Sequence, residues 1–515
     1  MAYIQGYNRN QAQMLPDYLE NYIDEENSTR VIDAFVEQIN IRKYNFTKIN
    51  KGGRGAPSYN PKDMLKLYLY GYMNGIRSSR KLEKSTYNNI EVMWLICKIH
   101  PDFKTIADFR KENKKQLKEI FKEFNLLCKE WSLFGAVLIA VDGTKLRADN
   151  SKKNNYNQKK IDRQLKYIDE KVSEYLKALE SEDKEVEVEI KPKYSMEELK
   201  ERIKKLKERK EFYETLDKQL KDNDINEIST TDPDARMMDN KKNGLEVNYN
   251  VQIAADSKNK LIIETEVTNS PCDQGHLNSM VQASKEELGL SEKDKIEVLA
   301  DKGYYQAEDL IKCEENGTIT YVTHQVYSNA TGDSNYYSNK FKYDSKEDIY
   351  ICPEGQSLYR INHKTAFPAQ IKYKNLNACK NCPQKEKCTK SSKGRVINRS
   401  KHQDFLDIVD ERTLENIDKY RQRQMLVEHQ FGTVKRAMNA GYFLTRGLES
   451  VRAEAALIFL AYNMKRVINI IGVKGIIERI KARYAFVFLK IKKTRNIYRV
   501  FRKNISSLPL NCINL

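Results

Sequence analysis

Two short apolar runs lie far apart in this chain, and an aspartate directly follows each of them. Residues 136–141 precede Asp142, and residues 296–300 precede Asp301. Apolar runs of this length are typical of buried strands. If both strands end at the same edge of one sheet, the two carboxylates meet there. This requirement constrains the fold more than any other feature of the sequence.

A third acidic residue, Glu428, lies in an amphipathic stretch that predicts a helix over residues 420–435. An apolar stripe that begins at Val427 would dock this helix on a sheet. Lys435 follows Glu428 by seven residues and Arg421 precedes it by seven, so both would project from nearly the same face. One carboxylate between two cations suits metal and phosphate binding, and simple salt bridging gives the same pattern.

Each acid taken alone has an ordinary explanation. Asp142-Gly and Asp301-Lys-Gly are typical of turns, and most helical glutamates are solvated. Taken together, oxygen ligands from two strand ends and a helix suit Mg²⁺, or Mn²⁺ in its place. Two such ions can activate an attacking oxygen and stabilise a leaving one during phosphoryl transfer. Asp142, Asp301 and Glu428 are therefore the candidate catalytic and metal-binding residues.

The charge balance favours a polyanionic partner. Among the 515 residues, 90 Lys and Arg face 72 Asp and Glu, a net charge of +18. The 31 tyrosines indicate a folded protein rather than a disordered basic one. We expect no membrane segment, because the longest apolar stretches are too short to span a bilayer. The nine mostly scattered cysteines favour a reducing, cytoplasmic environment.

The order of the predicted elements indicates an α/β fold with a mixed sheet flanked by helices. Residues 1–130 read as short helices joined by tight turns, compatible with either a helix-turn-helix or an ordinary helical bundle. Alternation over residues 245–255 predicts a strand with one half-buried face, and residues 261–268 return as the next strand. Residues 131–470 would form the catalytic domain.

Two insertions and a tail complete the predicted organisation. Residues 155–225 carry two apolar stripes at alternating spacings of four and three, which predict an antiparallel helical hairpin with a solvated or DNA-binding surface. Residues 311–400 contain clustered cysteines. Residues 471–515 form a strongly basic C-terminal tail.

The clustered cysteines have a spacing found in zinc sites. Cys379 and Cys382 are separated by two residues, Cys388 follows closely, and Cys352 would supply a fourth thiolate from a turn. Four thiolates can close a tetrahedral structural Zn²⁺ site. Reduced, metal-free thiols are the alternative.

Several segments together resemble one family, the bacterial insertion-sequence transposases of the DDE class, in the branch with a long helical insertion after the first aspartate. The matching segments are Tyr68–Glu83, Val141–Arg147, Thr231–Arg236, Ala300–Tyr305 and Val427–Arg436. The resemblance implies an RNase H-like catalytic domain, an N-terminal domain that binds DNA ends, and metal-binding roles for Asp142, Asp301 and Glu428. It also implies action on double-stranded DNA by a homodimer or larger oligomer, in the bacterial cytoplasm.

The same resemblance suggests contacts to DNA phosphates. The family pattern on the last helix has Tyr, Arg, Glu and Lys, which here are Tyr420, Arg423, Glu428 and Lys435. The family arginine stands four residues before the glutamate, where this chain has Gln424, so Arg423 and Arg421 both remain candidates. The full set of candidate DNA- or phosphate-binding residues is Lys435, Arg423, Arg421, Tyr420, Lys145, Arg147, Arg77 and Arg80.

Three functions agree with these features. The chain is expected to be a DNA transposase that cleaves and joins element ends. A divalent-metal nuclease without strand transfer is one alternative, and a non-catalytic DNA-binding protein of the same fold is another. Asp232 and Asp234, in an Asp-Pro-Asp turn, are expected to support the site rather than to form it.

Overall fold

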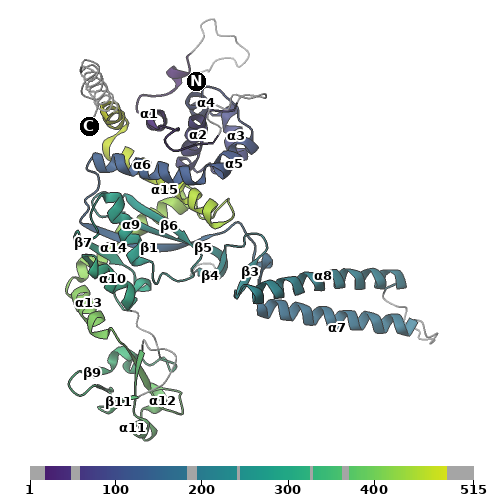
Figure 1. The fold of residues 1–515 in the computed structure, drawn as a ribbon, viewed down its shortest axis with the longest axis vertical. Helices are drawn as coiled ribbons and strands as arrows, with labels where there is room; N and C mark the ends of the chain where they lie inside the picture. The colour runs from purple at the N-terminus through teal and green to yellow at the C-terminus, as the bar shows by residue number, and fades with distance from the viewer. Residues whose placement is uncertain are drawn as a thin grey trace, which may run out of the picture. The chain divides into compact units, whose positions relative to one another are not determined.

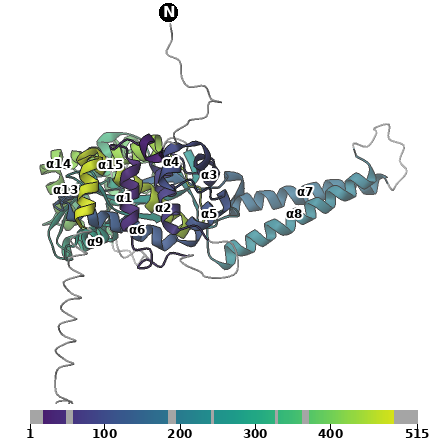
Figure 2. The same ribbon diagram turned by 90° about the horizontal axis from the view of Figure 1, so that it is seen from above.

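The computed structural model describes residues 18–47, 58–182, 194–240, 244–324, 329–361 and 370–483. These residues form two compact units (Figures 1 and 2). The first comprises Met1–Cys128, Leu146–Ala235 and Gly432–Leu515, and the second comprises Lys129–Lys145 and Arg236–Phe431. The predicted domain bounds follow a different division and stay predictions. The predicted basic tail lies mostly outside the described residues.

A six-stranded sheet forms the centre of the second unit. Its main path runs in the order β4-β5-β1-β7-β8, and β6 also pairs with β5. β1 is parallel to β7 and β7 is parallel to β8, whereas β5 is antiparallel to both β4 and β6. The strands are β1 (Leu138–Arg147), β4 (Arg236–Asn240), β5 (Gly244–Asp256), β6 (Ile262–Thr268), β7 (Ile296–Ala300) and β8 (Thr318–Tyr321).

Alternating side chains of the central strands pack on the two faces of this sheet. Ile139 and Val141 join a core with α9 (Leu277–Leu288) and α10 (Ala307–Glu315). Ala140, between them in sequence, belongs to another core with Leu426 and Val427 of α14 (Ile417–Gly432). Helices on both faces of a mixed sheet confirm the predicted α/β fold class and are consistent with the RNase H-like fold that the resemblance implies.

A smaller lobe follows β8 within the second unit. Its five-stranded sheet has the order β13-β12-β11-β10-β9 and is antiparallel throughout. The lobe begins later than the predicted insertion at residue 311, because α10 and β8 belong to the central sheet and its helical layer. Its elements are β9 (Lys342–Asp344), β10 (Ile349–Ile351), β11 (Ser357–Ile361), β12 (Gln370–Lys374), α11 (Leu376–Lys380), α12 (Lys385–Cys388) and β13 (Val396–Ser400), with the short turns η4 (Ser334–Tyr336) and η5 (Ser338–Lys340) before them.

Helices build the first unit. The N-terminal ones are α1 (Thr29–Gln38), α2 (Pro61–Met73), α3 (Ser79–Asn88), α4 (Ile90–Leu95), α5 (Phe103–Glu112) and α6 (Lys114–Glu130), preceded by the turn η1 (Leu19–Tyr22). α2 begins where Asn60 accepts a hydrogen bond from the Lys62 N–H, with Pro61 at the first helical position. It packs on α15 (Leu448–Ile471), whose middle is buried.

The predicted helical hairpin is present in the first unit. α7 (Gln158–Glu182) and α8 (Met196–Asp222) lie side by side (Figures 1 and 2). Ile161 and Ile168 of the first predicted stripe pack with Leu216 of the second, as the heptad spacing requires. Ser195 and Glu198 form a capping box at the start of α8. After the turn η2 (Lys152–Asn154), the antiparallel pair β2 (Asn155–Asn157) and β3 (Glu227–Ser229) closes the base of the hairpin.

No single described helix is long and apolar enough to cross a membrane. Leu448–Ile471 and Val473–Arg483, bent by 104° at their junction, reach the required length and composition only as a pair.

Candidate active site

Asp142 and Asp301 lie side by side on neighbouring strands. The parallel register pairs Val141 with Ala300, and each aspartate is the next residue along its strand. Asp142 remains within β1, whereas Asp301 directly follows β7 and precedes the short turn η3 (Lys302–Tyr304). The parallel pairing of these two strands brings together two carboxylates that are distant in sequence.

Arg423 of α14 bridges the two carboxylates. Its Nη1 lies 3.4 Å from Asp142 Oδ2, and its Nη2 lies 3.4 Å from Asp301 Oδ1. The packing of Leu426 and Val427 against the sheet fixes the helix face that carries this arginine. A single positive charge therefore stands between two negative ones, at the place where the sequence predicts metal ions.

Burial raises the pKa of the Asp142 carboxyl to about 7. The Arg423 guanidinium and the Gly143 N–H, which donates to Asp142 Oδ1 at 2.8 Å, both act to lower this pKa. The charges of Asp301 and Asp273 act to raise it. The ionised form of Asp142 is thus poorly stabilised by the protein alone, so a bound cation would stabilise it strongly.

Asp273 is a third carboxylate near this pair that sequence analysis does not identify. Its Oδ1 accepts hydrogen bonds from Asn250 Nδ2 at 2.7 Å and from Gln252 Nε2 at 2.8 Å. Lys145 Nζ, one of the predicted phosphate-binding groups, lies 3.3 Å from the same oxygen. Asp273 therefore holds a lysine close to the end of β1.

Two glycines make room for Asp273 beside the paired aspartates. A Cβ on Gly143 would lie 2.7 Å from Asp273 Oδ1, and a Cβ on Gly303 would lie 3.2 Å from Asp273 Oδ2. A glycine follows each of the two paired aspartates within two residues, and this spacing is a sequence signal for such a close approach. Because Asp142-Gly and Asp301-Lys-Gly are also typical of turns, the sequence alone does not show that these glycines allow another side chain to approach.

The prediction of one half-buried face for residues 245–255 is wrong. Asn248, Asn250 and Gln252, on the face opposite to Val247 and Tyr249, are also buried. Tyr304 is fully buried and donates a hydrogen bond from its hydroxyl to Gln252 Oε1. These amide residues form a buried polar layer on β5, and two of them, Asn250 and Gln252, donate hydrogen bonds to Asp273.

The described contacts do not bring Glu428 to the paired aspartates. Its side chain is exposed, and its Oε1 accepts a hydrogen bond from Gln424 Nε2 at 2.9 Å, one turn earlier on α14. α14 ends at Gly432, and a π-helical turn, η6 (Thr433–Ala437), carries Lys435. A π-helical turn has a wider angular spacing than the α-helix on which the shared face of Lys435 and Glu428 was predicted.

The two candidate arginines occupy different places in this structure. Arg423 stands at the paired aspartates, whereas Arg421 is exposed and pairs with Asp418 at 3.2 Å. Tyr420 shares a hydrogen bond with Thr323 at 3.0 Å on the same side of α14 as Arg423.

Arg77 is buried in the first unit, which argues against its predicted contact with a DNA phosphate. Its guanidinium donates to the Asn439 and Tyr442 carbonyl oxygens and to Glu454 Oε1. The exposed fraction of its side chain is 3% and that of Glu454 is 0%. Arg77 therefore serves the packing of this unit, which the sequence alone does not reveal.

Other predicted residues of the first unit are found at its surface or near a helix end. Arg80 is exposed above the Phe103 ring, and Arg147 is exposed beside the Tyr442 ring. Asp232 accepts a hydrogen bond from the Gly447 N–H at 3.1 Å, and Asp234 accepts one from the Leu448 N–H at 2.8 Å. These two aspartates cap the start of α15.

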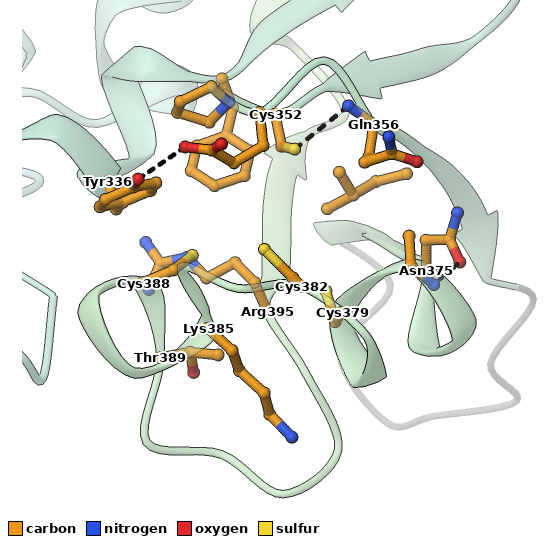
Figure 3. A pocket seen from close by; sticks show the side chains of 15 residues that line it. Tyr336, Cys352, Gln356, Asn375, Cys379, Cys382, Lys385, Cys388, Thr389 and Arg395 are labelled. Carbon is orange, nitrogen blue, oxygen red and sulfur yellow. Dashed lines mark hydrogen bonds between the residues drawn. The ribbon is translucent and has the colours of Figure 1, made fainter.

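The four clustered cysteines line one pocket in the smaller lobe (Figure 3). Burial raises the pKa of the Cys388 thiol to about 11, and the other three thiols act in the same direction. Among the described residues, no three His, Cys, Asp or Glu side chains are already arranged to hold a metal ion, either here or at the aspartates.

Two family models match the sequence. One, described as a transposase domain, covers residues 17–112, and the other, described as a transposase DDE domain, covers residues 351–468. Both matched models describe transposases, and together they support a DDE-type transposase. Transposases act on DNA, and those of the DDE type generally use divalent metal ions. The DDE match covers Glu428 and the cysteine cluster, whereas Asp142 and Asp301 lie outside both matched ranges.

The chain is similar to the piggyBac transposase in its synaptic complex with hairpin DNA, with 9% sequence identity and a TM-score of 0.32. The similarity covers 95% of this chain and 87% of the other. A search of curated proteins returned no match.

Proposed function

We propose that this transposase cleaves and joins the ends of its DNA element at Asp142 and Asp301, using two Mg²⁺ ions. The observation that supports this proposal most directly is the pair of carboxylates on neighbouring parallel strands, bridged by Arg423. Both are hard oxygen donors, and both already face a cation. The donor set therefore fits Mg²⁺ or Mn²⁺.

Metal ions bound here would activate the attacking oxygen and stabilise the leaving one during in-line displacement. The residues of the chain then have separate roles. Asp142 and Asp301 would hold the ions, and Glu428, the acid indicated by the family resemblance, would complete the site if its side chain left Gln424. Arg423, no longer needed between the carboxylates, is free to bind the phosphate at the scissile bond.

Asp273 is proposed as a positioning residue. It holds the Lys145 ammonium near the end of β1 and keeps the polar layer of Asn250 and Gln252 in place. Lys145 would then meet a DNA phosphate beside the reacting bond. Arg80, Arg147 and Lys435 remain proposed contacts to the DNA further away. An oligomer, at least a dimer, would bring two element ends together.

The test is strand cleavage and joining on the element's own end DNA with Mg²⁺. Asp301→Asn should abolish both steps, whereas the matched surface variant Asp418→Asn should retain them. Unchanged activity in Asp301→Asn would show that the site is wrong. Cleavage without any joining by the wild type would favour the nuclease, and DNA binding without cleavage would favour the non-catalytic protein.

A further inference from the structure

Four cysteines in the smaller lobe come from three separate segments and face one pocket. Cys352 follows β10, Cys379 lies in α11, Cys382 lies in the turn after it, and Cys388 ends α12. Figure 3 shows their sulfur atoms directed towards the space between these segments. All four are free thiols.

The backbone around Cys352 is shaped to present a sulfur ligand. Cys352 accepts a hydrogen bond on its carbonyl oxygen from the Gly355 N–H at 2.8 Å, and its own N–H donates to the Gln356 carbonyl oxygen at 2.9 Å. The Gln356 N–H then donates to Cys352 Sγ at 3.3 Å. A backbone N–H directed at sulfur stabilises a thiolate and orients it as a metal ligand.

A glycine makes the position of Cys379 possible. Gly394 has a φ of +80°, and a Cβ there would lie 2.8 Å from Cys379 Cβ and 3.2 Å from Cys379 Sγ. Any other residue would be strained in its backbone and would also push the cysteine away. The loop before β13 is thus packed tightly against one of the four thiols.

The described part of the lobe has a small hydrophobic core. Its core consists of five buried side chains, and Cys352 and Cys388 pack against this core. Small lobes with so few buried apolar groups usually need a disulfide or a metal ion for stability. The buried core residues are Phe341, Tyr350, Leu358, Tyr373 and Ile397.

We propose that Cys352, Cys379, Cys382 and Cys388 bind one structural Zn²⁺ ion. A set of four sulfur donors, with a Cys-x-x-Cys pair among them, suits tetrahedral Zn²⁺ and excludes Mg²⁺, which prefers oxygen ligands. The four thiols line the pocket without being closed around a common point, so binding would draw the sulfur atoms inward by rotation of their side chains. This site is separate from the aspartates and does not depend on the proposed catalytic function.

The test begins with the metal content of the full-length protein. We expect about one zinc per chain by elemental analysis, the stoichiometry of a closed four-thiolate site. Replacement by Co²⁺ should give the visible absorption of a tetrahedral site and strong sulfur-to-cobalt charge transfer. Less than one tenth as much zinc in Cys382→Ser, with full zinc in the exposed-cysteine control Cys272→Ser, would support the assignment.

A second variant leaves every thiol in place. Gly394→Ala should weaken zinc binding at least tenfold in a chelator competition, because its methyl group displaces Cys379. If either variant fails to fold, the cobalt spectrum of the wild type still decides the question. Absence of zinc together with a cobalt spectrum lacking sulfur charge transfer would overturn the proposal, and so would the presence of an iron–sulfur cluster in place of zinc.

Discussion

Asp142 should destabilise the metal-free protein, and Asp142→Asn should relieve that effect. Burial raises the pKa of this carboxyl from its ordinary value of 3.8 to about 7. A carboxyl with a raised pKa favours folding most when it is protonated, below its unfolded pKa. That stability is lost as pH rises from 3.8, and the loss is complete above about pH 7.

The size of the effect follows from the two pKa values. The interval from 3.8 to about 7, at about 1.4 kcal/mol per pH unit, gives an upper limit of about 4 kcal/mol. The Asp142 side chain is 20% exposed, so screening by solvent lowers this upper limit only slightly. Between about pH 5 and about pH 8.5 the same calculation gives a change of roughly 2.5 kcal/mol.

The assay compares thermal unfolding of wild type and Asp142→Asn with EDTA present, at about pH 5 and about pH 8.5. The asparagine does not titrate, so the variant's advantage should grow by roughly 2.5 kcal/mol, or roughly 5–10 °C in Tm for a unit of this size. Asp418→Asn, on an exposed carboxyl, should show no such growth. At the higher pH, Mg²⁺ should stabilise the wild type and not Asp142→Asn.

Constant losses in the variant, such as a weaker contact with Arg423, cancel in this comparison of two pH values. If the difference between wild type and variant stays the same at both pH values, the Asp142 pKa is ordinary and the electrostatic account of the site is refuted.

Three other variants test parts of this account. Arg423→Gln should lower DNA cleavage by about 100-fold and most strongly at acidic pH, because the arginine lowers the Asp142 pKa, whereas Arg421→Gln should cleave normally. Asp273→Asn should reduce cleavage, because it releases Lys145. It should also extend the remaining activity to lower pH, because the Asp273 charge raises the Asp142 pKa. An unchanged pH profile would contradict this role. Arg77→Gln should cost roughly 3–5 kcal/mol of unfolding free energy, in part recovered by adding Glu454→Gln, and DNA affinity of the folded fraction measured by titration should not change.

The parts of the fold that were predictable are those with a local pattern. The runs before Asp142 and Asp301 are short, apolar and bounded by turn residues, so their strands follow from the sequence. The hairpin follows from its heptad spacing in the same way. Both patterns repeat the periodicity of the backbone they form, and no distant contact is needed to recognise them.

The parts that were missed depend on contacts between distant segments. Asp273 lies in a loop that has no apolar periodicity beside it. Its place near the paired aspartates depends on the close approach of Gly143 and Gly303, which the structure shows. The burial of Arg77 depends on Glu454, which lies in α15 at the other end of the chain. The π-helical turn that carries Lys435 was also missed, because such a turn differs from an α-helix in spacing but has no distinct composition.

The anchoring of α13 (Gln403–Glu415) indicates that the smaller lobe can loosen without displacing the paired aspartates. The lobe lies between β8 and α13, and α13 is tied directly to the central sheet and its helical layer. Arg412 donates to the Thr320 carbonyl oxygen and pairs with Glu314, and the Val322 N–H donates to Thr413 Oγ1. The lobe contacts α13 separately, through ion pairs of Arg399 in β13 with Asp404 and Asp407. Because α13 leads into α14, the place of Arg423 is set by the sheet, so removal of zinc should loosen the lobe while Mg²⁺ still stabilises the aspartate pair.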